Sequence, residues 1–333
     1  MTTALQVYGD ITPRTAAKAM VPLLKRHDAV MLLERFGQTF LLPTKSTKVA
    51  IFRRFEALAL ATTALVEGVT PSGTKPTITD YACTLSEYGD FIPYSGFMLD
   101  THEDPILQEY GSLCVQQAAE TVETLRWHVV KAGTQVGYTN GGITTVNTPI
   151  NLNAQRTATA AMLRQRAKPI TEVVSSSAAF RTEPVEAGFV AIHHTDVTND
   201  IRNMQGYIPA KQYQGQTKLF PGEHGSVEDV RYCRSVLYTP FAGATGVYGG
   251  ASTTMRNTAS FADVYSVLYL SADAYGIVPL KGSNAMSLIA HNPGSSGTGD
   301  PLNQRGTLGW KCAQTSLILN DLWLYRLHCA VTL

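Results

Sequence analysis

The chain has 333 residues, of which 44% are hydrophobic and only 16% are charged, and its formal net charge is +1. A domain that binds nucleic acid through its overall charge is strongly basic, so this balance excludes that class. The hydrophobic content and the small net charge also exclude an intrinsically disordered chain. At about 100–200 residues per domain, the length predicts about two domains.

Neither a membrane segment nor a disulfide framework is predicted. The first ten residues lack the basic stretch and apolar run of a secretory signal, and no stretch approaches 18 uninterrupted apolar residues. The five cysteines include no Cys-x-x-Cys pair. An odd number of scattered cysteines is typical of reduced thiols in an intracellular compartment. We therefore expect no membrane contact and no zinc ribbon.

The beginning of the chain changes from a helical to a strand pattern. Two helical stretches are predicted, the first starting at Thr12-Pro13 and the second ending at Gly37. Between residues 48 and 85, side chains alternate as in strands about the Gly/Pro-rich segment 68–76, which predicts a long hairpin. Arms of ten to twelve residues would extend about 35 Å. Because a two-stranded ribbon has little core of its own, we expect another surface to cover it.

The strongest helix signal covers residues 104–132. Asp104 can cap this helix and Pro105 suits its first position. The predicted apolar stripe consists of Leu107, Tyr110, Cys114, Ala118, Val122, Leu125 and Val129. A helix of this length would span about 42 Å, well above the usual length, which makes it a candidate strut for the whole molecule.

Short elements are predicted for the rest of the chain. A helix at 154–168 should begin at Asn153 and end before Pro169. Beyond it, we expect strands at 189–192, 236–238, 264–270 and 275–280, a short helix at 196–204 and an exposed loop at 283–301. Residues 308–313 and 323–331 alternate about a turn at Asn320-Asp321, which predicts an antiparallel hairpin. These elements together predict an α+β fold.

Three patterns could carry chemistry, but each has a simpler structural interpretation. His193, His194 and Asp196 are of the types that bind zinc or iron, yet adjacent residues on a strand point to opposite faces. The carboxylates at 100–104 could act as acid and base, but they precede a long helix, where negative charge is stabilising. The glycines at 294–299 lack the Lys-Ser/Thr ending of a phosphate loop. We predict no catalytic residue, no metal site and no cofactor.

Basic side chains are the remaining candidates for contacts with a partner. The helix at 154–168 carries Arg156, Arg164 and Arg166 and no acidic residue. These side chains are either simply solvated or contact an acid or a phosphate. Arg53 and Arg54, on the ribbon, are well placed to reach a neighbouring subunit.

The order of these elements resembles the major capsid proteins of tailed bacteriophages, which have the Hong Kong 97-like (HK-97-like) fold. Both share a leader helix, a long hairpin, a long strut helix, a mixed domain and a terminal β segment. Several short stretches resemble the coliphage N4-type major capsid family in particular. These stretches are 88–91, 100–109, 220–228, 300–306, 309–311 and 319–323.

The resemblance implies a division of the chain. It assigns 1–45 to an N-terminal arm and 46–92 to an extended β-hairpin loop that lies over a neighbour. It assigns 93–180 to a peripheral domain containing the spine helix, about 104–132. Residues 181–300 become an axial domain whose loops meet around capsomer axes, and 301–333 return to the peripheral domain as a terminal β segment.

The resemblance also implies the function and the partners. The chain is expected to be a structural protein, and not an enzyme, that assembles in the host cytoplasm into an icosahedral virion shell around double-stranded DNA. Its expected partners are copies of itself in hexamers and pentamers, then portal, scaffold and cement proteins, with weak non-specific contact to DNA. A near-zero net charge suits such a shell. Each phosphate contact adds affinity for DNA, and a shell should not bind tightly the DNA that must later leave it. The inter-subunit candidates are Val49, Ile51, Arg53, Arg54, Lys75, Arg156, Arg164 and Arg166.

Two other classes stay open from the residues alone. Another kind of virion protein, or a Thr/Gly-rich adhesin-like β protein, would show short strands and no long helix. An enzyme with an unrecognised site would show a cluster of titratable groups in a deep pocket.

Overall fold

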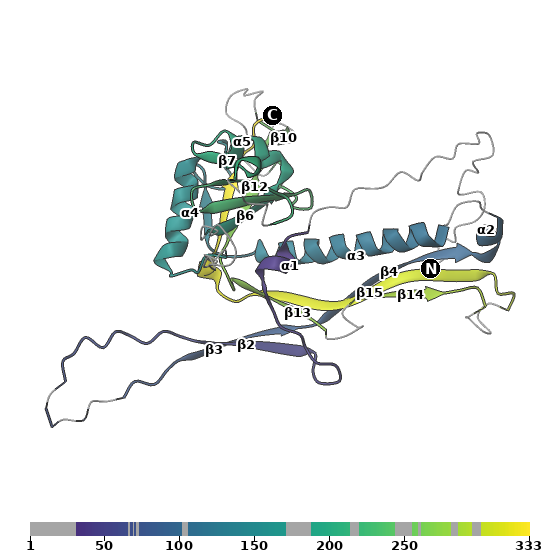
Figure 1. Ribbon diagram of the computed structural model, residues 1–333, viewed down its shortest axis with the longest axis horizontal. Helices are drawn as coiled ribbons and strands as arrows, with labels where there is room; N and C mark the ends of the chain where they lie inside the picture. The colour runs from purple at the N-terminus through teal and green to yellow at the C-terminus, as the bar shows by residue number, and fades with distance from the viewer. Residues whose placement is uncertain are drawn as a thin grey trace, which may run out of the picture.

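The structure is a computed structural model that contains two β-sheets, one long helix and a projecting hairpin (Figure 1). It describes residues 31–65, 67–68, 70, 73–101, 106–170, 188–213, 220–243, 255–258, 261–280, 286–294 and 301–333. The predicted helix start at Thr12-Pro13 and the predicted cap at Asp104-Pro105 lie outside these residues. The second predicted helical stretch is present as α1 (Leu33–Phe36), which ends at Gly37.

A five-stranded sheet is built around the 14-residue strand β15 (Arg305–Ile318). Along one edge it pairs with β4 (Ser86–Ser95) over the full length of β4. Along the other edge it pairs with β14 (Met286–His291) and then with β13 (Tyr275–Pro279), which in turn pairs with β1 (Gln38–Thr39). Helix α2 (Gly96–Thr101) directly follows β4.

A mixed seven-stranded sheet forms the second body of the molecule. Its strands, in spatial order, are β5 (Val136–Tyr138), β16 (Leu324–Cys329), β12 (Tyr265–Leu270), β6 (Phe189–His194), β9 (Val230–Ser235), β8 (Glu223–Val227) and β7 (Tyr207–Pro209). Short elements surround it: helix α5 (Thr198–Arg202), the 3₁₀ turns Thr195–Val197 and Ala210–Gln212, and the small pair β10 (Asn257–Thr258) and β11 (Phe261–Ala262).

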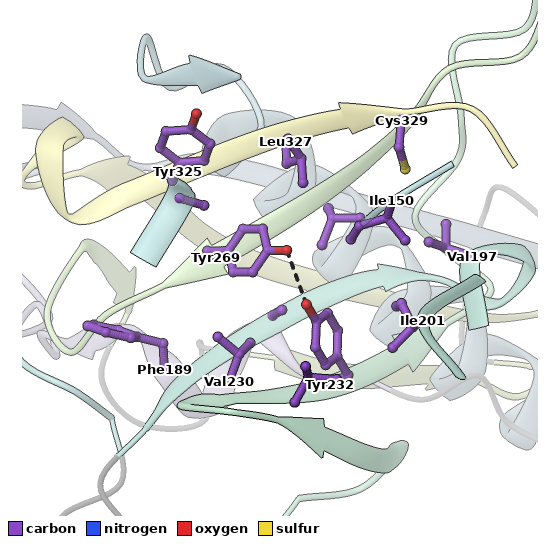
Figure 2. Packing of buried hydrophobic residues seen from close by; sticks show 14 of the residues in the cluster. Ile150, Phe189, Val197, Ile201, Val230, Tyr232, Tyr269, Tyr325, Leu327 and Cys329 are labelled. Atoms are coloured by element: carbon purple, nitrogen blue, oxygen red, sulfur yellow. Dashed lines mark hydrogen bonds between the residues drawn. The ribbon is translucent and has the colours of Figure 1, made fainter. Parts of the chain in front are cut away.

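One face of the seven-stranded sheet packs against helix α4 (Leu152–Arg164). Ala158 and Met162 of this helix are fully buried in a core with Tyr232 and Tyr269, whose hydroxyl groups lie 3.1 Å apart (Figure 2). The cap of α4 is Asn151, which accepts a hydrogen bond from the backbone of Ala154 at 2.8 Å. The cap therefore lies two residues before the predicted cap at Asn153.

Helix α3 (Ile106–Val130) confirms the predicted strut and joins the two sheets. Cys114 and Ala118 pack against β15 of the five-stranded sheet, whereas Trp127 and Val130 lie in a core with the seven-stranded sheet. Leu125, which the sequence placed on the buried stripe, is only half-buried. The contact face rotates along the helix because its two ends pack on different sheets.

A buried carboxylate fixes the start of the described chain to this helix. Glu123 is 1% exposed and accepts hydrogen bonds from the backbone of Leu32 at 2.8 Å and of Leu33 at 3.0 Å. The hydroxyl of Tyr238 donates to the same oxygen at 2.6 Å. Since a buried charge is costly unless it is hydrogen-bonded, this arrangement holds α1 against α3.

Three predicted β features are wrong. The terminal strands do not form a hairpin: a 3₁₀ turn at Asp321–Trp323, capped by the Asn320 side chain, carries the chain from β15 in one sheet to β16 in the other. No strand covers 236–238, because the hydroxyl of Ser235 accepts from the backbone of Leu237 at 3.4 Å and favours a turn. The predicted loop at 283–301 contains strand β14.

We predict that Ala118→Asp prevents soluble folding, because it places an unpaired charge between α3 and β15. An uncompensated buried charge costs about 3–5 kcal/mol, a large part of the stability of a domain. Val115→Asp is the matched control on the same helix, since Val115 is 48% exposed. Soluble yield and circular-dichroism melting compare the two, and an Ala118→Asp protein as stable as its control would contradict the packing.

Candidate assembly surfaces

The hairpin consists of β2 (Val49–Phe55) and β3 (Ile78–Thr84), paired antiparallel along their full length. The two faces of this ribbon differ. Phe52 and Ala50 point inward, while Ile51 and Phe55 point outward and are 58% and 65% exposed. Large apolar side chains exposed together on one face are typical of an interaction surface.

The root of the hairpin belongs to the core of its own subunit. Ala50 is buried with Leu42 and Val278, and Phe52 packs beside them. The ring of Phe52 lies on Gly276, where a Cβ atom would come within 2.9 Å of it. The resemblance assigned 46–92 to a loop that lies over a neighbour, but the root of this segment packs in the core of its own subunit, and β4 at its end pairs with β15.

The paired part of the hairpin is shorter than predicted. Each strand has seven residues, or about 23 Å at 3.3 Å per residue, and pairing ends at Phe55 and Ile78. The described residues between them contain no strand. One side of this segment alternates Ala and Leu, whereas the other is rich in Thr, Gly and Pro, so the two sides offer no matched cross-strand pairs. Leu58 and Leu60 in this segment are 58% and 83% exposed.

The arginines of the hairpin already have acidic partners within the chain. Arg53 forms a two-pronged contact with Asp80 on the paired strand, at 2.8 and 2.9 Å. The guanidinium group keeps the pKa of the Asp80 carboxyl below its usual value. Arg54 contacts Glu56 at 2.7 Å, and this contact lowers the pKa of Glu56. The outward face of the ribbon is therefore apolar except for the ion pair between Arg53 and Asp80, whose charges neutralise each other.

The other basic candidates lie on separate surfaces. Arg156 forms an ion pair with Glu228 across the α4 face of the seven-stranded sheet. Arg164 and Arg166 are exposed at the end of α4, and Arg166 has a left-handed backbone with φ of 55°. Lys75 is exposed near the hairpin tip. The fold does not bring these side chains together with the hairpin arginines into one site.

A groove lies on the five-stranded sheet, on the face opposite α3. Alternate residues of a strand point to opposite faces, and Trp310 packs toward α3, so its neighbours Gly309 and Lys311 face the groove. The groove has a volume of about 640 Å³, and Phe91 of β4 and Ile289 of β14 also line it. They are 51% and 40% exposed.

A glycine shapes the floor of this groove. Gly309 is paired directly opposite Phe91, and a Cβ atom at Gly309 would lie 2.7 Å from the Cβ of Phe91. Lys311 and Glu87 form an ion pair at 3.0 Å at one side. The groove is thus largely apolar, with its charges paired. The groove was not predicted from the sequence, although the stretches 88–91 and 309–311 that build it resemble motifs of the family.

The hairpin and the groove lie at opposite ends of the molecule. Figure 1 shows the hairpin extending to the left of the view, whereas β14 and the adjoining part of β15 extend to the right. Two different surfaces at opposite ends favour a head-to-tail contact between identical copies. Such a contact produces closed rings when the rotation between successive copies allows it.

Of the other sites considered from the sequence, the structure addresses the metal candidate; the carboxylates Glu103 and Asp104 and the glycines Gly297 and Gly299 lie outside the described residues. Within them, no group of three or more His, Cys, Asp or Glu side chains could hold a metal ion. His193 is buried, and His194 lies instead beside Asp196 at 3.3 Å, so the two imidazoles point apart as predicted. No helix in the described part of the chain is both long and apolar enough to cross a membrane.

Comparison with known proteins identifies the family. The family model described as phage capsid protein matches residues 79–322. The capsid of Ralstonia phage GP4 has a TM-score of 0.70 at 10% sequence identity, covering 99% of this chain and 98% of that one. The capsid of the cyanophage P-SCSP1u has a TM-score of 0.63 at 11% identity, covering 96% and 94%. No curated protein matched the sequence.

The fold is therefore that of the Hong Kong 97-like capsid proteins, with an α+β composition. The chain belongs to the phage capsid protein family, and it is a major capsid protein, a structural component of an icosahedral phage shell. The long helix α3 excludes the adhesin-like alternative, which required short strands without such a helix.

The internal pairing of Arg53 gives a testable prediction. Arg53→Glu places two carboxylates opposite each other in the ribbon, so we expect it to loosen the hairpin and to reduce the yield of assembled particles. The exchange Arg53→Glu with Asp80→Arg restores the pair within the chain and should restore the yield. Sedimentation measures both. If the exchanged protein assembles as poorly as Arg53→Glu alone, the important partner of Arg53 is on another subunit.

Proposed function

We propose that copies of this major capsid protein assemble head to tail, with the hairpin of one copy lying over the groove of the next. The observation that carries the proposal is the placement of two exposed apolar surfaces at opposite ends of one subunit. A hairpin cannot reach the groove of its own subunit from the opposite end. A second copy is therefore the natural partner for both surfaces.

The chemistry of the two surfaces supports this pairing. Ile51 and Phe55 offer an apolar face, and Phe91 and Ile289 offer another. The ion pairs on both sides are closed internally, so bringing the surfaces together leaves no unpaired charge in the contact. Burial of apolar area, at about 25 cal/mol per Å², would then drive the association.

Rings built in this way would be the hexamers and pentamers of the shell. In this arrangement, 1–45 act as an N-terminal arm and 46–92 as the extended loop, whose root and β4 end are anchored in the subunit. Residues 93–180 and 301–333 act as the peripheral domain, and 181–300 as the axial domain. The small net charge suits weak, non-specific contact with packaged DNA.

We also propose that the protein assembles in the host cytoplasm together with portal, scaffold and cement proteins. The short motifs support an affiliation with the N4-type capsid family. We propose a purely structural role, without catalysis.

The proposal predicts that the subunit folds without its hairpin tip but does not form shells. Replacing residues 57–76 with Asn-Gly closes the ribbon where the backbone of Glu56 already donates to Thr77 at 3.0 Å. The root contacts of Ala50 and Phe52 remain, so circular dichroism should show a folded protein. Electron microscopy should show no closed particles. Full-size particles from this variant would contradict the proposal.

A second variant tests the groove. Ile289→Asp places a charge on the groove surface and should prevent assembly without unfolding the subunit, since Ile289 is 40% exposed. Ile208→Asp is the control, because Ile208 is 48% exposed on β7, away from the groove. Particle yield by sedimentation should fall only for Ile289→Asp. Equal yields from the two variants would exclude the groove as a contact.

A further inference from the structure

Two buried imidazoles meet in the seven-stranded sheet, and one of them lies in the motif 220–228, which the proposed assembly contacts do not involve. His193 on β6 is fully buried, and His224 on β8 is 8% exposed. Their Nε2 atoms lie 2.9 Å apart, although β9 separates the two strands in the sheet. A β-bulge between Glu223 and Gly225 makes this contact possible, since bulges re-aim side chains.

A tyrosine completes the network. The hydroxyl of Tyr207 on β7 lies 3.0 Å from Nδ1 of His224 and 2.8 Å from the carbonyl oxygen of the same residue. Gly225 makes room for this ring, because a Cβ atom there would lie 2.5 Å from it. The bulge, the glycine and the tyrosine thus combine to hold His224 against His193.

The hydrogen bonds assign the protons. Nδ1 of His193 lies 2.7 Å from the carbonyl oxygen of His194, which can only accept, so this nitrogen carries a proton. In a neutral His193, Nε2 must then accept from the N–H of His224. The two roles are therefore different: His224 is the donor of the pair, and His193 is its acceptor.

The pair of imidazoles can accommodate one added proton but not two. A proton added at Nδ1 of His224 keeps the network intact, because Tyr207 can turn its hydroxyl toward the carbonyl of His224 and accept from Nδ1. One added proton can be accommodated on either ring, because His224 can carry its own proton on Nδ1, beside the Tyr207 hydroxyl, and accept from His193 at Nε2. When His193 is protonated in addition to His224, both Nε2 atoms carry a proton, and since two donors cannot bond, the contact opens.

We propose that His193 and His224 form an acid-sensitive lock, in which protonation of His193 in addition to His224 separates β6 from β8 and loosens the outer strands of the seven-stranded sheet. Apart from His224 and Tyr207, the described titratable and charged groups that face His193 or lie on the strands packed around it are His194, Tyr232, Cys233, Arg234, Glu223, Arg231, Tyr265 and Tyr269. Glu223 and Arg231 neutralise each other at 3.0 Å. Arg234 opposes a positive charge on His193.

The burial of His193 also favours a loss of stability in acid. Desolvation, followed by the smaller influence of Arg234 and His194, lowers the pKa of His193 from 6.5 to about 3. The unfolded chain therefore binds a proton at this residue before the folded chain does. The stability that the lock contributes is complete above pH 6.5 and is lost as the pH falls toward 3. Burial lowers the pKa of His328 to about 4, so this residue contributes an independent loss of stability in acid.

The test compares the unfolding of the full chain at pH 7.5 and pH 4.5. His193→Gln keeps an acceptor for the N–H of His224 but cannot be protonated. We expect acidification to raise the unfolding equilibrium constant about 100-fold less in this variant than in the unaltered protein, since 4.5 lies two pH units below 6.5. His224→Gln keeps both His193 and a donor to it, and His128→Gln alters an exposed histidine. Both should keep the full acid loss, and an unchanged acid loss in His193→Gln would overturn the proposal.

A measurement on the unaltered protein covers the case in which His193→Gln does not fold. Solid-state ¹⁵N NMR of the full chain applies to free subunits and to shells alike. At pH 4.5 it should show coupling between two histidine rings through an N–H···N hydrogen bond, with the accepting ring neutral and protonated at Nδ1, as the contacts with His224 and His194 require. A spectrum without this coupling at pH 4.5 would overturn the proposal.

Discussion

Burial of helix α3 against two different sheets is the interaction on which the rest of the structure depends. Its 25 residues span about 37 Å, with Ala118 packed on the five-stranded sheet and Trp127 packed in the core of the seven-stranded sheet. The helix is a stiff rod, so it fixes how far apart the two sheets lie. Glu123, buried midway between those contacts, adds α1 to the same assembly through hydrogen bonds to backbone N–H groups.

This frame determines which surfaces remain for other copies. The hairpin is anchored at its root by Phe52 and Ala50, but beyond the root its outward face has no cover within the described part of the subunit. The groove around Gly309 lies at the other end of the five-stranded sheet. Each surface can be buried only by a second molecule, so assembly adds stability that the monomer lacks. Folding and assembly are therefore coupled through mass action.

The elements with strong local signals could be predicted from the sequence. The long helix, the buried strand at 189–192, the strand at 275–280 and the existence of the hairpin all follow from periodicity and turn residues. Their tertiary partners could not be predicted. Cys114 and Ala118 were placed correctly on the stripe, but Leu125 was not, because a helix that packs on two sheets does not keep one straight contact line.

The same limit on prediction from the sequence applies to the candidate surfaces. An exposed apolar ribbon could be predicted, since a two-stranded hairpin cannot bury its own side chains. The partner of Arg53 could not, because Asp80 becomes its cross-strand neighbour only once the register is set. The groove depends on Phe91, Ile289 and Gly309, which come from three separate strands and meet only in the folded sheet. The loop prediction at 283–301 failed for a related reason, since β14 is stabilised by pairing with β15 more than by its own pattern.

The central claim is that one hairpin and one groove form each contact, and mixing two assembly-deficient proteins tests it most directly. One protein carries Asn-Gly in place of 57–76 and keeps its groove, while the other carries Ile289→Asp and keeps its hairpin. Only one contact can then form, from the hairpin of the second protein to the groove of the first, and neither chain can extend further. Native mass spectrometry should show each protein as a monomer alone and a one-to-one heterodimer in the mixture. A mixture that stays monomeric would contradict the account.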